Sequence, residues 1–111
     1  MRREVKLWLA QRVTAVVLAA CIFVHLATII YAVRNGLTAA EILGRTRGSA
    51  GWAAFYATFV IAAAIHGAIG LRTVASEWLR LRGDLLEIGM TVAGVGLTIL
   101  GLRAVYAVFG A

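Results

Sequence analysis

The sequence predicts an all-α integral membrane protein with three transmembrane helices in an up-down-up arrangement. Of its 111 residues, 62% are hydrophobic and only 14% are charged, which is too little polar surface to cover a soluble core. The apolar residues gather in three runs of about 20 residues, the length of a membrane-spanning helix. The chain has no proline, which favours uninterrupted helices. We therefore expect residues 1–111 to form a single membrane domain.

The expected spans are residues 13–33, 50–71 and 88–109. The first run is too long for the apolar core of a signal peptide, so we expect it to remain as a span. Between the first two runs, Thr38 and Glu41 have the spacing of a capping box. This pattern predicts a short helix at about residues 38–43, which we place at the membrane interface.

The net charge of +6 is interpreted as a topology signal rather than as a nucleic-acid site, because the basic residues flank the apolar runs. Lysine and arginine accumulate in cytoplasmic loops. The N-terminal flank and the second loop carry most of them, namely Arg2, Arg3, Lys6, Arg12, Arg72, Arg80 and Arg82, against Arg34, Arg45 and Arg47 in the first loop. The N-terminus is therefore expected in the cytoplasm. We expect the chain in a bacterial inner membrane and expect no nucleic acid as a partner.

Two histidines, His25 and His66, lie well inside the first and second spans and are the only histidines in the chain. An ionisable group in hydrocarbon is costly and indicates a functional site. A structural zinc site needs four ligands, which is more than two histidines supply. A proton relay usually includes buried carboxylates, and no Asp or Glu lies mid-span. Haem iron needs only one neutral imidazole at each axial position. The alternative to a functional role is a neutral histidine that donates a hydrogen bond to a backbone carbonyl of a neighbouring helix.

The two histidines differ in expected depth by roughly 10 Å, counted from the basic residues Arg12 and Arg72 at 1.5 Å per residue. Two ligands of one upright haem would lie at similar depth. We therefore expect His25 and His66 to ligate two different haems, each completed by a histidine from another chain. That chain is either a second copy of this protein or a sibling subunit, and together they would form a haem-binding bundle.

The segment around His66 resembles a motif of a known family. His66, Gly70 and Arg72, followed by Glu77 and Trp78, are similar to the second-span motif of the succinate dehydrogenase and fumarate reductase membrane anchors, or cytochrome b subunits. The resemblance implies that His66 is an axial ligand of haem b and that Gly70 leaves room for the macrocycle. It also implies that Arg72 and Glu77 line the region of the quinone and the haem propionates. Trp78 stands where one sibling anchor carries a quinone-binding tyrosine.

The start of the first span is also similar to this family. Residues 11–15, Gln-Arg-Val-Thr-Ala, resemble its His-Arg-hydrophobic-Ser-Gly entry, with Gln11 in place of the histidine and Trp8 in place of a serine. The resemblance implies that Arg12 and Thr14 contribute to a quinone site. His25 looks like the first-span histidine of the two-haem members.

The resemblance implies a haem b-binding anchor subunit of a succinate:quinone oxidoreductase or fumarate reductase. Such a chain acts as an enzyme only within its complex, and it passes electrons between an iron–sulfur subunit, haem and the quinone substrate. Its partners would be iron–sulfur and flavoprotein subunits on the cytoplasmic face, a second anchor chain and the lipid bilayer. Arg103, near the outer end of the third span, is a candidate partner for a propionate of the outer haem, or else reaches the outer headgroups. Alternatives are a cytochrome b-type anchor of another quinone-linked dehydrogenase and a non-catalytic membrane scaffold subunit.

Overall fold

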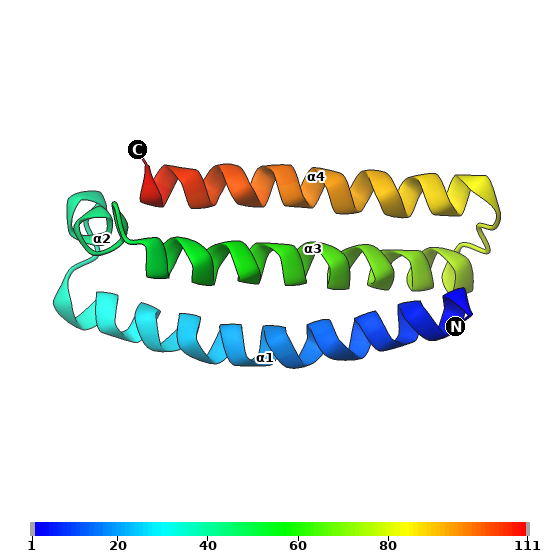
Figure 1. Cartoon of the computed structure of the whole chain (residues 1–111), viewed down its shortest axis with the longest axis horizontal. Coiled ribbons are helices and arrows are strands. Elements are labelled where there is room, and N and C mark those ends of the chain that lie inside the picture. The colour runs from blue at the N-terminus through cyan, green and yellow to red at the C-terminus, as the bar shows by residue number, and fades with distance from the viewer. Residues whose placement is uncertain (1, 111) are drawn as a thin grey trace.

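The computed structural model describes residues 2–110, and within that range its only secondary structure is helical (Figure 1). The four helices are α1 (Arg3–Asn35), α2 (Ala39–Thr46), α3 (Ala50–Trp78) and α4 (Asp84–Phe109). By length and composition, α1, α3 and α4 are each able to cross a membrane. The three expected spans each lie inside one of these long helices.

The long helices lie side by side, and consecutive ones run in opposite directions (Figure 1). Helix α3 lies in the centre, because it packs against both α1 and α4, whereas α1 and α4 make few contacts with each other. The bundle measures 48 × 25 × 24 Å. This arrangement leaves α3 with two packed sides, so a polar group on α3 can meet a partner on either neighbour.

Large apolar side chains lie mostly on the outside of the bundle. Phe23, for example, is 80% exposed. The buried positions are mainly small, and α3 supplies Ala62, Ala64 and Ala68. Small residues let helix backbones approach closely in a membrane, where lipid is as apolar as the helix surfaces. The fold is therefore held by close helix contacts and by a few polar pairs rather than by a large apolar core.

Two glycines of α4 mark its closest approach to α3. A Cβ added at Gly94 would lie 3.3 Å from the Cβ of Ala68, and one at Gly101 would overlap Cγ1 of Val60. The two glycines are seven residues apart, which is two helical turns and therefore the same face of α4. Substitution of Gly101 must displace one helix, because there is no space for a side chain.

Helix α2 lies across the end of the bundle opposite the N-terminus (Figure 1). Its N-cap is Thr38, whose side chain accepts a hydrogen bond from the backbone N–H of Glu41 and donates to the Glu41 carboxylate at 2.7 Å. The hydroxyl of Thr46 donates to the carbonyl of Val108 at 2.7 Å, which fastens α2 to the last turn of α4. These bonds close the end of the bundle opposite the N-terminus.

Candidate functional site

The side chain of His66 points from α3 towards α1. Its Nδ1 lies 3.2 Å from the hydroxyl oxygen of Thr14, which is only 7% exposed. The same hydroxyl lies 2.7 Å from the carbonyl oxygen of Ala10, one turn earlier in α1. Within residues 2–110, the other ring nitrogen of His66, Nε2, has no hydrogen-bond partner. A neutral imidazole held in this way at one nitrogen is the form that binds a metal through the other.

The side chain of His25 points the opposite way, from α1 towards α3. Its Nδ1 lies 3.3 Å from the hydroxyl of Tyr56, and its ring meets those of Tyr56 and Phe59 edge to face, with centroids 5.7 and 5.6 Å away. His25 also lines an open, apolar cavity of about 490 Å³ to which all four helices contribute residues. The cavity is lined by His25, Ile42, Thr46, Tyr56, Phe59, Val60, Ala63, Gly101, Ala104, Val105 and Val108.

The two histidines therefore share one helix interface but lie at different levels of it. His66 is level with Thr14, and His25 is level with Tyr56. About ten residues of α1 or α3 separate these levels, which corresponds to about 15 Å along the bundle. One cofactor standing upright between the helices would not reach both rings.

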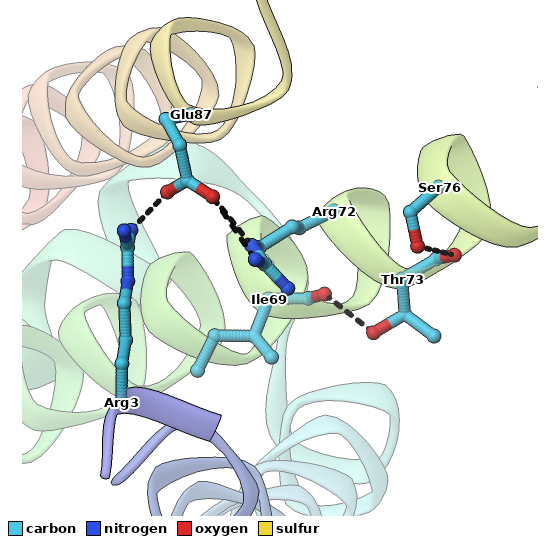
Figure 2. Close-up of polar contacts among 6 residues, drawn as sticks. All are labelled: Arg3, Ile69, Arg72, Thr73, Ser76 and Glu87. Atoms are coloured by element: carbon cyan, nitrogen blue, oxygen red, sulfur yellow. Dashed lines mark hydrogen bonds and ion pairs between the residues drawn. The ribbon is translucent and has the colours of Figure 1, made fainter. Parts of the chain in front are cut away.

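A cluster of charged residues joins the three long helices at the end where the N-terminus lies, as Figure 2 shows. Glu87 of α4 accepts hydrogen bonds on Oε1 from Nε and Nη2 of Arg72 at 3.1 and 3.0 Å. Its other carboxylate oxygen pairs with Arg3 of α1. We call Arg3, Arg72 and Glu87 the charged clasp. Glu87 thereby orients the Arg72 guanidinium, which is the candidate partner for a propionate or a quinone.

The remaining candidates at this end are spread over a wider area. Glu77 lines an open, partly polar cavity of about 640 Å³ together with Arg72 and Glu87. Trp78 projects outward and is 80% exposed. The guanidinium of Arg12 lies over the ring of Trp8, 5.0 Å from its centroid. Arg12 and Trp78 do not line the cavity, so the structure gathers only part of the expected quinone set.

The structure also gives the surroundings of three other predicted residues, Thr14, Gly70 and Arg103. Thr14 is buried against His66 rather than open to a quinone. Gly70 faces α1, where an added Cβ would lie 3.7 Å from Nε2 of Gln11. Arg103 lies on an outer face of α4 and does not line the cavity that contains His25. The structure therefore does not bring Arg103 together with His25.

Sequence reasoning missed two partners, Tyr56 and Glu87. Tyr56 is an aromatic residue inside a span, and nothing in its spacing marks it as a partner of His25. The pairing of Glu87 with Arg72 could have been predicted, because the two residues flank the same short loop and hence lie at similar depth. Among residues 2–110, no three His, Cys, Asp or Glu side chains gather into a group that could hold a metal ion. Each histidine thus offers a single ligand, as an axial haem position requires.

A protein-family model matches most of the chain. The family model described as "Succinate dehydrogenase/Fumarate reductase transmembrane subunit" matches residues 1–102. Searches of curated proteins and of solved structures find no match. Because the family match covers nearly the whole chain, including both histidines, the protein belongs to the family of succinate dehydrogenase/fumarate reductase transmembrane subunits.

Proposed function

We propose that this membrane anchor subunit binds haem b and takes part in electron transfer between the iron–sulfur subunit and quinone. Membership of the family supports the partnership with iron–sulfur and flavoprotein subunits. The observation that carries the haem assignment is the pairing of His66 with Thr14, since it occupies Nδ1 and leaves Nε2 available. Haem would supply one-electron storage and transfer in a dry environment.

His66 and His25 would each supply one axial ligand to a separate haem. Their separation of about 15 Å along the α1–α3 interface supports two cofactors rather than one. The opposite axial ligand of each haem would come from a second anchor chain, either a sibling or a second copy. In such an assembly, this chain's contribution is to hold each imidazole at a fixed level and to surround it with apolar side chains.

We place the charged clasp at the cytoplasmic face of a bacterial inner membrane, with the N-terminus on that side and the spans up, down and up. This orientation follows from the excess of arginine and lysine there. The open cavity near Glu77 then lies where the iron–sulfur subunit would dock, and it is the best candidate for the quinone headgroup. Arg72 would donate hydrogen bonds to a quinone carbonyl or to a propionate. Arg12 and Trp78 would contact the membrane-facing side of the bound quinone.

The test is the haem content of the detergent-purified complex, measured as pyridine haemochrome for the wild type and for His66→Ala and His25→Ala. If the histidines serve separate haems, the wild type carries two haems per complex and each variant loses one. The flavin-to-protein ratio serves as the control for assembly. A fully assembled complex that lacks haem would contradict the proposal, and so would variants that keep the wild-type haem content.

The measurement also separates the alternatives. Loss of both haems in either single variant would favour a shared site over two separate ones. Retention of haem in both variants, with unchanged succinate-dependent quinone reduction, would favour structural roles for His25 and His66. Reduced-minus-oxidised spectra recorded after addition of succinate then test whether the remaining haem accepts electrons from the catalytic subunits.

A further inference from the structure

We propose that Thr14 is a positioning residue that fixes the ring tautomer of His66, so that Nδ1 carries the proton and Nε2 presents its lone pair. This inference rests on the proposed ligation of haem by His66. It gives Thr14 a role at the histidine instead of at the quinone. It also explains why a polar side chain is buried at the α1–α3 interface.

The Thr14 hydroxyl carries a single proton. Two backbone carbonyl oxygens of α1 lie within reach of this hydroxyl, that of Ala10 at 2.7 Å and that of Gln11 at 3.2 Å. A hydroxyl has one proton to donate and two lone pairs to accept with. With its proton directed to the nearer carbonyl, Oγ1 can only accept at the 3.2 Å contact with His66. His66 must then donate, which places the proton on Nδ1.

The opposite tautomer would break this network. If Nε2 carried the proton, the Thr14 hydroxyl would have to donate to Nδ1 and turn away from both carbonyls. In a buried, low-dielectric position such a lost bond is expensive. The β-branched Thr14 is also restricted at χ1 within a helix, which keeps Oγ1 in one place. Because hydroxyl and ring come from different helices, the tautomer is set only when α1 and α3 are packed.

The second histidine lacks this arrangement. Among the described residues, the Tyr56 hydroxyl contacts His25 but no backbone carbonyl, so the phenol can either donate or accept. The tautomer of His25 is therefore not decided by its hydroxyl partner. This difference assigns a tautomer-fixing role to Thr14 specifically and not to every hydroxyl near a histidine.

The first measurement requires no haem. Histidine ¹⁵N spectra of the full chain in lipid bilayers, prepared from haem-deficient cells, distinguish the two neutral tautomers, and His25→Gln assigns the signals. We expect the Nδ1–H form for His66 in the wild type and in Thr14→Ser, which keeps the hydroxyl. Thr14→Val, which has nearly the same shape without a hydroxyl, should shift His66 towards the Nε2–H form. An Nε2–H ring in the wild type would overturn the proposal by itself.

The second measurement uses the purified complex. Losing a hydrogen-bond partner of a metal-binding histidine typically weakens metal affinity 10- to 100-fold, and we expect such a loss of haem affinity in Thr14→Val but not in Thr14→Ser. The reduction potential of the remaining haem should rise, because an imidazole whose Nδ1–H has no acceptor donates less electron density. Thr98→Val is the matched control, since Thr98 bonds a carbonyl of its own helix at 2.8 Å but no histidine.

The outcomes separate this inference from the proposed function. Wild-type tautomer, haem affinity and potential in Thr14→Val would overturn the role of Thr14 while leaving His66 as ligand. An Nδ1–H ring together with full haem content in His66→Ala would overturn the ligation while leaving the tautomer assignment intact. If Thr14→Val does not accumulate, Thr14→Ala against Thr14→Ser isolates the hydroxyl, since both lack the methyl group. If Thr14→Ala also fails to accumulate, the wild-type spectrum still decides.

Discussion

Replacement of Gly101 by alanine is expected to force α3 and α4 apart. A Cβ at this position would overlap Cγ1 of Val60 and would lie 3.0 Å from its Cγ2 and 3.2 Å from its Cβ. Rotation of the valine about χ1 moves the two methyl groups but not Cβ, and one rotamer dominates for valine in a helix. The clash must therefore be relieved by a backbone shift.

The magnitude follows from two opposing effects. Extra volume in a packed interface typically costs about 1–3 kcal/mol, whereas alanine is better than glycine in a helix by up to about 1 kcal/mol. Gly96 lies in the same helix, and a Cβ there would meet nothing within 4 Å. Gly96→Ala therefore shares the helix effect without the clash. Gly101→Ala should be less stable than Gly96→Ala by about 1–3 kcal/mol, or roughly 5- to 150-fold in the folding equilibrium.

The assay is reversible unfolding of the full chain in mixed micelles by titration with dodecyl sulfate, followed by tryptophan fluorescence. Adding Val60→Ala to Gly101→Ala should recover most of the lost stability, because the shorter side chain makes room for the new methyl group. The double-mutant cycle gives the coupling between the two positions directly. Equal midpoints for Gly101→Ala and Gly96→Ala would refute the close approach of α3 and α4 at this point.

Glu87→Gln removes the carboxylate that two arginines share, so deuterium uptake by the backbone amides in the first turns of α1 should increase. Unchanged uptake would contradict the charged clasp. Thr46→Val removes a hydrogen bond from α2 to the end of α4, which is worth about 1 kcal/mol. The rate of proteolysis within α2 should therefore rise about fivefold. An unchanged rate would show that other contacts hold α2. An impermeant maleimide applied to intact cells should label Asn35→Cys but label Arg82→Cys only after permeabilisation, while the buried native Cys21 stays unlabelled. The reverse pattern would invert the proposed orientation.

The sequence was sufficient for the long helices, because an apolar run of about 20 residues has few alternatives to a membrane span. The helix ends were less predictable. Helix α1 begins at Arg3, well before the expected span at residue 13. Hydropathy indicates where lipid surrounds a helix, whereas a helix continues as long as its backbone bonds are made. The polar first turns of α1 thus escaped detection, although they carry a member of the charged clasp.

The pairing of side chains between helices was the main part that spacing did not reveal. The partners of the two histidines, Thr14 and Tyr56, depend on the rotation and register of α1 against α3, which close packing of small residues decides. The motif around His66 was visible because its members lie within one helix. Arg103 shows the converse, since its depth suggested a place near His25 but its face of α4 directs it elsewhere.

The charged clasp has a consequence for the order in which the chain can become fixed in the membrane. Arg3 and Glu87 are 84 positions apart, and synthesis proceeds from the N-terminus. The first helix therefore leaves the ribosome long before its carboxylate partner on the last helix exists. Until α4 has been made, the beginning of α1 has no counter-charge from that helix. A chain interrupted within the second loop would keep both arginines and lack the residue that joins them.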